Sequence, residues 1–285
     1  MKISIVTPNY NYADFVGETI QSVICQTYQN FEHIIVDDGS TDNSVEIIQK
    51  FVTKYPDKII LIRQENKGQT AAINVGLKAA KGDIVGWINS DDTYCDDTFE
   101  LVINQFENDP NADIVFGDMN SIDLAGNFIF RRRHTNFSFL TGCYLGFTRI
   151  LSSNAVFWTR QAMEKNGLPV ESLLCNMDGE FYSRLTMGMK VIRVNSALAN
   201  FRKQPHTKAA EKNKNWEQIV KKELMFELHN SYNRLSISKN IPYRLSFPIK
   251  YMLQGKRVLL RLLNMHFLKQ YFESRNYKMK YNSGK

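Results

Sequence analysis

Two patterns of hydrophobic positions alternate along the first 116 residues. Short apolar runs, typical of strands buried on both faces, are followed by segments with apolar residues every three or four positions, typical of helices. The expected strands are Ile3–Thr7, Phe31–Val36, Lys58–Ile62, Asp83–Ile88 and Asp113–Phe116. The expected helices are Glu18–Gln26, Ser44–Phe51, Thr70–Ala80 and Asp97–Phe106. This alternation predicts an α/β fold with a mostly parallel sheet that crossover helices flank.

After Phe116 the pattern becomes less regular. We expect two strands within Ser121–Arg133, around a turn at Ala125-Gly126-Asn127. Phe137–Tyr144 is aromatic and polar, which fits either a loop or a short helix. The other expected elements are a strand at Ser153–Trp158, a helix at Asp178–Leu185 and short strands at Lys190–Val194 and Ala197–Phe201. Together these elements predict a first domain over residues 1–205.

Residues 206–285 are predicted to form a basic, helical C-terminal extension. Trp216–Asn230 has helical periodicity, and Ile249–Phe272 carries polar, mostly basic residues every three or four positions. The net charge of +7 conceals an asymmetry, because residues 1–200 sum to −7 and residues 201–285 to +14. An amphipathic helix with a basic face is typical of contact with anionic membrane surfaces. Packing of this helix on the first domain, with its polar face in solvent, is the alternative.

The composition is that of an ordinary globular protein, with 43% hydrophobic and 23% charged residues. The four cysteines are scattered without CxxC spacing, so neither a zinc site nor a disulfide framework is indicated. No apolar run reaches the length of about 18 residues that a transmembrane helix needs. The apolar run near the N-terminus is too short for a signal peptide. Free thiols and these absences lead us to expect a cytoplasmic protein.

Two acidic clusters follow expected strands. The first is IVDDGSTDNS (residues 35–44), and the second is WINSDDTY (residues 87–94). Ligands of open parallel sheets bind beyond the carboxyl ends of the strands, so both clusters are expected on one ligand-binding edge. The adjacent carboxylates of Asp91 and Asp92 repel each other unless a cation lies beside them, and their hard oxygen atoms suit Mg²⁺ or Mn²⁺ that bridges a diphosphate. Each cluster taken alone is also compatible with a helix cap. The presence of two acidic clusters on one edge favours a metal site over two caps.

A third group, MDGEFYSRL (Met177–Leu185), begins the helix expected near residue 178. Glu180 and Arg184 have the spacing of an i,i+4 ion pair. Asp178 fits two roles, an N-cap of this helix or a general base. The residues of this segment leave both roles open.

The chain resembles the family 2 glycosyltransferases of the GT-A fold. The resemblance rests on SIVTPNYN, ETIQSVICQTYQNFEHIIVDDGSTDNS, ENKGQTAAINVGLKAAKGDIVGWINSDD and MDGEFYSRL, in the family's order and spacing over about residues 1–205. It implies an inverting transfer of a sugar from a nucleotide sugar, with UDP favoured, to a hydroxyl of a saccharide or lipid-linked acceptor. It also implies a role in surface polysaccharide biosynthesis on the inner face of the plasma membrane.

The resemblance implies a role for each matching residue. Asp38 would hydrogen-bond the base, and Asp178 would deprotonate the acceptor hydroxyl. Asp92 would be the more direct ligand of Mn²⁺ or Mg²⁺, with Asp91 also at the metal and near the ribose and diphosphate. The residues implied at the donor nucleotide are Thr7, Pro8, Tyr10, Asp38, Asn66, Lys67, Gly68 and Asp91.

Two positions depart from the family pattern. The acidic motif often begins with a further aspartate, where this chain has Asn89, and Ile73 stands where many members carry a basic residue. The first difference is expected to weaken the affinity for the metal. The second removes a basic contact to the donor.

Other nucleotide-binding classes lack their motifs in this chain. A dehydrogenase requires GxGxxG after the first strand, where this sequence reads TPNYNYAD, and the GxxxxGK[ST] motif of P-loop enzymes is absent. The glycine-rich basic loop of sugar nucleotidyltransferases is also missing. Nucleic-acid binding is not expected, because only the charge of the tail suggests it. The alternative that stays open is a catalytically inactive scaffold of the same fold, which binds a nucleotide sugar or a glycan.

Overall fold

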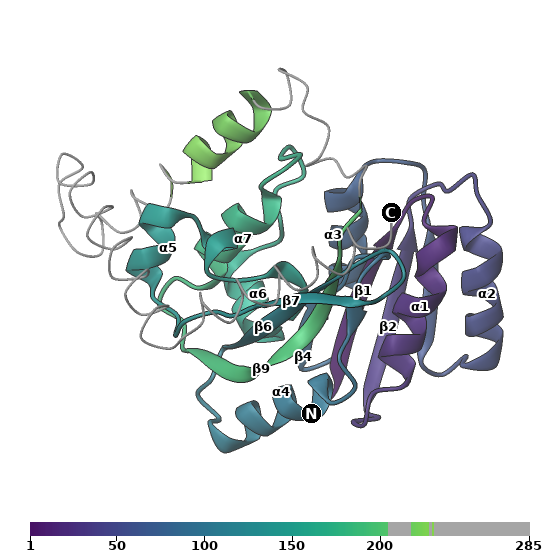
Figure 1. The fold of residues 1–285 in the computed structure, drawn as a ribbon, viewed down its shortest axis with the longest axis horizontal. Helices are drawn as coiled ribbons and strands as arrows, with labels where there is room; N and C mark the ends of the chain where they lie inside the picture. The colour runs from purple at the N-terminus through teal and green to yellow at the C-terminus, as the bar shows by residue number, and fades with distance from the viewer. Residues whose placement is uncertain (205–217, 228–229, 231–285) are drawn as a thin grey trace, which may run out of the picture.

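The computed structural model describes residues 1–204, 218–227 and 230. Within this part, nine strands form one sheet in the order β3-β2-β1-β4-β8-β6-β9-β5, with β7 paired to β6 (Figure 1). The strands are β1 (Ile3–Asn9), β2 (Phe31–Asp37), β3 (Ile59–Arg63), β4 (Ile84–Trp87), β5 (Thr93–Tyr94), β6 (Ile114–Ile122), β7 (Phe128–Arg132), β8 (Val156–Thr159) and β9 (Val191–Arg202). The helices are α1 (Ala13–Ile24), α2 (Ser44–Lys54), α3 (Gln69–Ala79), α4 (Thr98–Asn108), α5 (Phe139–Leu145), η1 (Phe147–Arg149), η2 (Ser153–Ala155), α6 (Arg160–Asn166) and α7 (Met177–Leu185).

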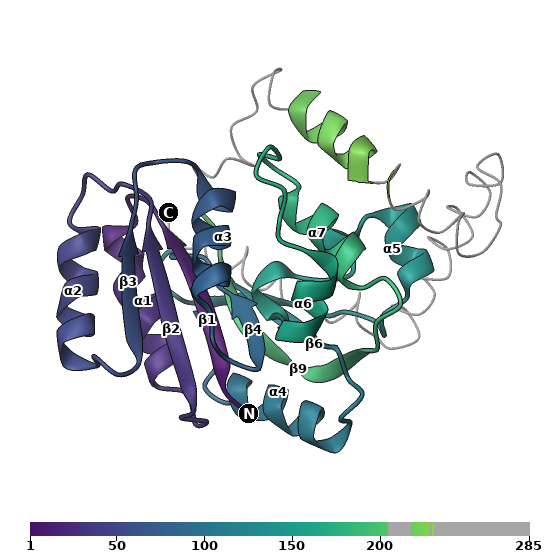
Figure 2. The same cartoon turned by 180° about the vertical axis from the view of Figure 1, so that it is seen from behind.

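The first half of the sheet is parallel, as the alternation predicts. β1 pairs in parallel with β2 and β4, and β2 pairs in parallel with β3. Successive side chains of a strand point to opposite faces, so Ile34 and Val36 of β2 pack with α3, whereas Ile35 packs with α1 and α2. Figures 1 and 2 show these helices on the two sides of the strands. Because β1, β2 and β4 run in one direction, the loops that follow them meet at one edge.

The second half of the sheet is mixed. β8 lies between β4 and β6 and is antiparallel to both. β9 is one strand from Val191 to Arg202, where the sequence predicted two short strands, and it pairs in parallel with β6 with register shifts near Asp118. These shifts let the long strand bend without ending. The predicted α/β class is confirmed, with antiparallel pairs added where the sequence pattern loses its regularity.

Helix α1 begins at Ala13, five residues before the predicted Glu18. Its first turn is held from the loop after β2, because the Ala13 amide donates to Asp42 Oδ2 at 2.9 Å and the Tyr12 amide donates to Ser44 Oγ at 3.1 Å. These bonds join residues about 30 positions apart, so no local sequence pattern predicts them. The segment predicted as a loop or short helix forms α5, whereas α6 and β5 were not predicted.

Residues 218–227 form a helix, which confirms that part of the helix predicted at Trp216–Asn230. Its Glu223 and Glu227 accept hydrogen bonds from Cys175 and Asn176 just before α7, so this part of the predicted extension contacts the preceding residues (Figure 1). The predicted boundary at residue 205 and the basic helix Ile249–Phe272 lie outside the described residues, and both stay predictions. Among the helices of the described ranges, none is long and apolar enough to cross a membrane.

Candidate active site

The loops after β1 and β2 are bound to each other at the edge of the sheet. Asn9, the last residue of β1, donates from Nδ2 to Asp37 Oδ1 at 3.0 Å and to Ser40 Oγ at 3.1 Å. Asn11 Oδ1 accepts the Thr41 amide at 2.8 Å. The acidic DDGS turn therefore lies against the TPNYN segment, as the parallel topology predicts.

Asp38 organises the segment before α3. Its buried carboxylate accepts the Lys67 amide at 2.9 Å, the Gly68 amide at 2.8 Å and Gln64 Nε2 at 2.7 Å. Gly68 has φ +91°, a left-handed conformation that glycine adopts at little cost. The structure thus joins three residues predicted at the nucleotide, and the exposed Asn66 lies in the same segment. Since both oxygens of Asp38 accept protein hydrogen bonds, its predicted contact with a base stays a prediction.

A hollow of about 660 Å³ opens beside these loops. The residues that line it are Tyr10, Asn11, Tyr12, Ala13, Asp14, Phe15, Asp42, Asn43 and Gln204. Of the predicted nucleoside contacts, Tyr10 is exposed and lines the hollow, whereas Thr7 and Pro8 are buried. Thr7 Oγ1 lies 2.8 Å from Nε2 of the buried His33, whose pKa burial lowers to about 3. The side chain of Thr7 therefore belongs to the core, and the Pro8 carbonyl accepts the Ser90 hydroxyl at 2.7 Å, so neither residue lines the hollow and their contact with a nucleoside stays a prediction.

The acidic turn after β4 borders the hollow. Asp91 Oδ2 accepts a hydrogen bond from Gln204 Nε2 at 2.7 Å. Asp92 is fully buried, and its Oδ1 accepts the Arg202 amide at 2.8 Å. Its Oδ2 accepts the side-chain amides of Asn89, at 3.2 Å, and Asn154. The position where the family often has a further aspartate thus holds a donor that binds Asp92.

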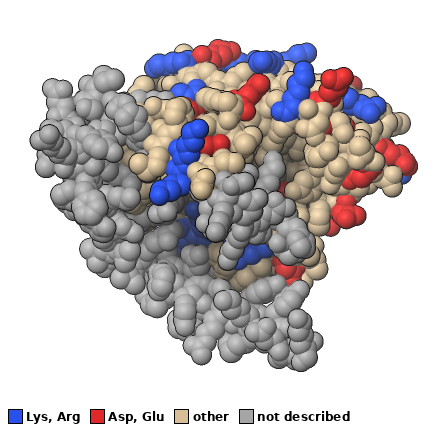
Figure 3. Space-filling view, turned by 90° about the horizontal axis from the view of Figure 1, so that it is seen from above, with Lys and Arg blue, Asp and Glu red and all other residues tan. Residues whose placement is uncertain are grey.

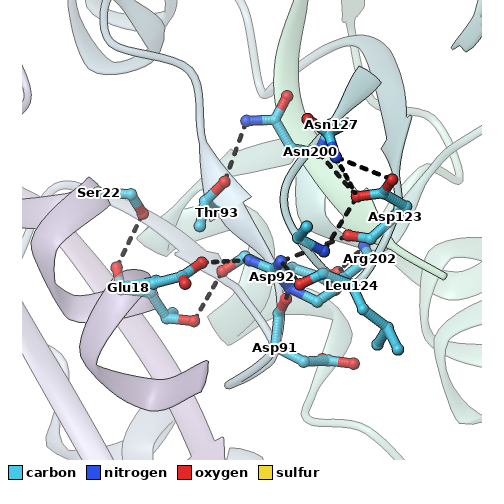
Figure 4. Close-up of polar contacts among 12 residues, drawn as sticks. Glu18, Ser22, Asp91, Asp92, Thr93, Asp123, Leu124, Asn127, Asn200 and Arg202 are labelled. Carbon is cyan, nitrogen blue, oxygen red and sulfur yellow. Dashed lines mark hydrogen bonds and ion pairs between the residues drawn. The ribbon is translucent and has the colours of Figure 1, made fainter. Parts of the chain in front are cut away.

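Arg202, at the end of β9, fastens this turn to the rest of the fold (Figure 4). Its side chain is 1% exposed, and it donates from Nε to the Asp91 carbonyl at 2.9 Å. Nη1 donates to the Leu124 carbonyl at 2.8 Å, and Nη2 forms an ion pair with Glu18 of α1. No local sequence pattern identifies Arg202, because its partner Glu18 lies 184 positions away.

Burial raises the pKa of both carboxyl groups in this turn. The pKa of Asp91 is raised by desolvation, and that of Asp92 well above its usual range by desolvation and by the negative charge of Asp91. The pKa of Tyr12 rises to about 12 because of burial and the same two carboxylates. Such a concentration of negative charge favours a cation.

The residues of the turn fit a divalent cation. Mg²⁺ and Mn²⁺ prefer oxygen ligands, and Mg²⁺ is usually held by one or two carboxylates together with substrate phosphates. Asn154 Oδ1 is buried with no hydrogen-bond partner among the described residues, which places an unused oxygen beside Asp92. Residues 1–204 with 218–227 and 230 hold no group of three or more His, Cys, Asp or Glu suited to a metal. Asp91 is 9% exposed and bonded to Gln204, which lines the hollow, so it is better placed than the fully buried Asp92 to meet a ligand from solvent.

Asp178 lies in the first turn of α7 and is partly exposed. The N-cap of this helix is Asn176, so the capping role left open for Asp178 is not the one observed. Asp178 Oδ1 accepts the Gly179 amide at 2.9 Å. Burial raises the pKa of this carboxyl group to about 6, against the lowering effects of that hydrogen bond and of the charge of Arg132. A carboxyl group with a pKa near 6 is suited to proton transfer near neutral pH.

A cluster of buried aromatic rings docks α7 onto β4. Tyr182 stacks on Trp87 with ring centroids 5.7 Å apart, and Phe181 lies 5.5 Å from the same ring. The Tyr182 hydroxyl donates to the Ser153 carbonyl at 3.1 Å, next to the Asn154 that binds Asp92. The helix that carries Asp178 is therefore fixed to the strand that carries the acidic turn. The predicted ion pair in α7 is confirmed, because Arg184 Nε lies 2.7 Å from Glu180 Oε1.

An α/β sheet with acidic turns at the ends of parallel strands, and a third carboxylate on a helix that packs on β4, is the arrangement expected of a glycosyltransferase of the GT-A type. A model of the family "Glycosyl transferase family 2" matches residues 4–166. The chain belongs to glycosyl transferase family 2, as its resemblance implied.

Relatives in sequence carry the same name. The chain is 39% identical over 131 residues to an uncharacterized glycosyltransferase of Nostoc sp. (strain PCC 7120), a match that covers 44% of this chain and 41% of that protein. It is 40% identical over 130 residues to the glycosyltransferase GlyG of Streptococcus pneumoniae serotype 4, covering 45% of this chain and 42% of the relative. The matches thus span less than half the length of these relatives.

Solved structures share the fold. S. aureus TarS 1–349 in complex with UDP-GlcNAc superposes with a TM-score of 0.62 at 17% identity, covering 100% of this chain and 93% of the other. The mannosyltransferase PcManGT from Pyrobaculum calidifontis, in complex with GDP-Man and Mn²⁺, superposes with a TM-score of 0.54 at 17% identity, covering 95% of this chain and 84% of the other. At these identities the likeness establishes the GT-A fold.

Proposed function

We propose that this protein transfers a sugar from a metal-bound UDP-sugar to a hydroxyl group of a saccharide or lipid-linked acceptor, with inversion at the anomeric carbon. The observation that carries the proposal is the position of Asp178. Its carboxyl group has a pKa of about 6, and its helix is docked by Tyr182 and Phe181 onto the strand that ends at the acidic turn. In this proposal the packing of α7 on β4 joins the base for the acceptor to the site for the donor.

The donor binds at the hollow beside the ends of β1, β2 and β4. Tyr10 provides an exposed aromatic ring there, and Asp38 keeps the 66–68 segment in a fixed conformation by its bonds to the Lys67 and Gly68 amides. Lys67 is exposed, and its cation is proposed to pair with the diphosphate. Uridine is proposed as the base on the family resemblance. The neighbours in fold bind UDP, UDP-GlcNAc or GDP-Man, which supports a nucleotide-sugar donor in general.

Asp91 and Asp92 are the proposed holders of Mn²⁺ or Mg²⁺. When bound, the metal offsets the negative charge that develops on the departing nucleotide. Asp91 offers its carboxylate beside Gln204, which lines the hollow, and Asp92 serves as a metal ligand if Asn89 and Asn154 release its Oδ2. Arg202 holds the backbone of Asp91 through its carbonyl and the side chain of Asp92 through its carboxylate.

Asp178 is the proposed general base. It accepts the proton of the acceptor hydroxyl while that oxygen attacks the anomeric carbon from the face opposite the nucleotide. The C–O bond to the acceptor forms as the bond to the diphosphate breaks, and the diphosphate leaves with the bonding electron pair. One displacement inverts the configuration. A positioned base of this kind contributes about 10²–10⁴-fold to the rate.

Surface polysaccharide assembly at the inner face of the plasma membrane is the proposed setting. The support is the charge of +14 over residues 201–285 and the basic periodicity of Ile249–Phe272. In Figure 3, acidic and basic side chains are interspersed over the described part of the face seen from above. Cosedimentation with anionic vesicles tests the proposal. Equal binding by the full chain and by a chain ending at Ser246 would contradict it.

A panel of nucleotides tests the donor site. UDP, GDP and dTDP are added to the full chain with and without Mn²⁺, and the melting temperature is compared for wild type and Asp91→Asn. A ligand that binds only the folded state stabilises it by about 2.7 kcal/mol at a hundred times its Kd. UDP is expected to raise the melting temperature of wild type only with Mn²⁺, and Asp91→Asn is expected to lose most of this shift. A shift with GDP alone would change the proposed base, and no shift with any nucleotide would favour the inactive scaffold.

A further inference from the structure

Helix 218–227 presents two buried carboxylates to the catalytic domain. Glu223 and Glu227 are 7% and 0% exposed, whereas Lys221 and Lys222 beside them are exposed. Residues four apart lie on one face of a helix, so the two glutamates point together toward α7. Burying a carboxylate is costly unless hydrogen-bond donors of the protein replace the water molecules that it loses. The donors whose hydrogen bonds each glutamate accepts therefore show which part of the chain it holds in place.

Glu223 accepts hydrogen bonds from the backbone amides just before α7. Its Oε1 accepts the Leu174 amide at 2.8 Å, and its Oε2 accepts the amides of Cys175 at 2.8 Å and Asn176 at 3.0 Å. Three successive amides thus converge on one side chain. Hydrogen bonds to a charged acceptor are about twice as strong as neutral ones, so this segment is firmly held.

Glu227 joins the start of α7 to η1. Its Oε2 accepts Asn176 Nδ2 at 2.6 Å, and its Oε1 accepts the Phe147 amide at 2.8 Å. Gly179 allows the close approach, because a Cβ atom at this position would lie 2.7 Å from Glu227 Oε2. Asn176 is the N-cap of α7, and Asp178 follows two residues later. Both glutamates therefore act on the residues that determine where Asp178 points.

We propose that Glu223 and Glu227 are positioning residues, which hold residues 174–176 and the first turn of α7 so that Asp178 meets the acceptor hydroxyl. The inference rests on the proposed role of Asp178 as the base. It extends the catalytic unit beyond the motif-bearing segments to helix 218–227. Neutral glutamine cannot replace Glu223 fully, because its single carbonyl oxygen has to serve three amides that now share two oxygens.

A general base that is no longer held in position is expected to lower kcat more than it weakens the binding of the donor. A displacement of about 1 Å in a catalytic group can lower the rate about 10²-fold. The contacts of Glu223 and Glu227 given above are with residues 147 and 174–176, away from the residues that line the donor hollow. The two variants are therefore expected to lower kcat and to leave the KM for the donor nearly unchanged.

The experiment compares full-length wild type with Glu223→Gln, Glu227→Gln, Asp178→Asn and the control Lys222→Gln. The control removes one charge from an exposed position of the same helix. UDP-GlcNAc, UDP-glucose, UDP-galactose and GDP-mannose are the donor probes, with water or a hydroxyl-rich oligosaccharide mixture as acceptor, and nucleotide release is measured. Hydrogen–deuterium exchange of peptides that cover residues 170–180 measures how firmly Glu223 and Glu227 hold this segment, independently of enzymatic activity. Circular dichroism measures folding.

Glu223→Gln and Glu227→Gln are expected to lower kcat about 10- to 100-fold and to keep KM within about twofold. Exchange over residues 174–176 is expected to accelerate in Glu223→Gln and to match wild type in Lys222→Gln. If the glutamate variants match Lys222→Gln in kcat while Asp178→Asn is inactive, the positioning role is overturned and the base assignment stands. If Asp178→Asn keeps wild-type turnover, the base assignment itself fails. Loss of folding in both glutamate variants would assign them to the fold as a whole and overturn the proposal.

Discussion

Replacing Asp178 by asparagine is expected to stabilise the protein at neutral and basic pH. Burial raises the pKa of the carboxyl group from 3.8 to about 6. Each pKa unit corresponds to about 1.4 kcal/mol, so keeping Asp178 ionised in the folded chain costs about 1–3 kcal/mol, after allowance for its partial exposure. Asparagine keeps an oxygen for the Gly179 amide and carries no charge.

The sign of the effect follows from the two pKa values. Below about pH 4 the carboxyl group is protonated in both the folded and the unfolded chain, so it makes little difference to stability. Between about pH 4 and 6 the unfolded chain ionises first, and the stability of wild type falls as pH rises. Above about pH 6 the full cost is present. The advantage of Asp178→Asn is therefore expected to be small at pH 4 and about 1–3 kcal/mol at pH 8.

Urea unfolding followed by circular dichroism at pH 4.5 and pH 8 measures this difference. Asp57→Asn is the matched control, because Asp57 is exposed. Its stability is expected to stay within about 0.5 kcal/mol of wild type at both pH values. A variant at residue 178 that is destabilised at pH 8, or whose effect is the same at both pH values, would refute the assignment of a raised pKa and with it the poised base.

Three further results are expected. Arg202→Met removes the donor of the Asp91 and Leu124 carbonyls and is expected to lower the free energy of unfolding by about 2–5 kcal/mol in urea. The same change at the exposed Arg63 is expected to lower it by under about 1 kcal/mol, and equal effects would refute the role of Arg202 in holding the acidic turn. Gly76→Ala places a Cβ atom 2.3 Å from Val6 Cγ1 and is expected to cost about 1–3 kcal/mol in thermal unfolding, so an unchanged melting temperature would contradict the close packing of α3 on β1. Transfer under saturating donor is expected to fall about tenfold for each pH unit below about 6, as Asp178 becomes protonated; a flat profile from pH 5 to 8 would exclude it as the base.

The sequence predicts the parallel half of the sheet well, because each strand and helix there carries its own local pattern. Buried strands carry short apolar runs, such as Ile34–Val36 within Phe31–Asp37 and Ile84–Trp87, and the acidic turns follow at their ends. Parallel pairing then brings the turns to one edge without further information. The position of β8 between β4 and β6 has no such local signal, because an antiparallel insertion depends on contacts that form only in the folded sheet.

The candidate site likewise has residues that a local motif predicts and residues that only the fold brings into place. Asp91, Asp92 and Asp178 are recognisable by motif, and the stacking of Tyr182 on Trp87 packs the helix that carries Asp178 against the strand before Asp91 and Asp92. The residues that set their environment carry no motif. Asn154 reaches Asp92 from 62 positions away, and Glu227 reaches Asn176 from 51 positions away. From the sequence alone, a polar side chain this far along the chain from its partner is expected at the surface, because only the fold shows that it is buried.

The central claim is tested most directly by nucleotide release from sugar donors. UDP-GlcNAc, UDP-glucose, UDP-galactose and GDP-mannose are each incubated with Mg²⁺ and full-length wild type or Asp178→Asn, with an oligosaccharide acceptor mixture present. Release of nucleotide and the anomeric configuration of the product are followed by NMR. We expect one donor to be consumed with inversion by wild type and at least about 100-fold more slowly by Asp178→Asn, with UDP binding retained in both. Equal turnover by the two proteins, retention of configuration, or no turnover of any donor would contradict the account.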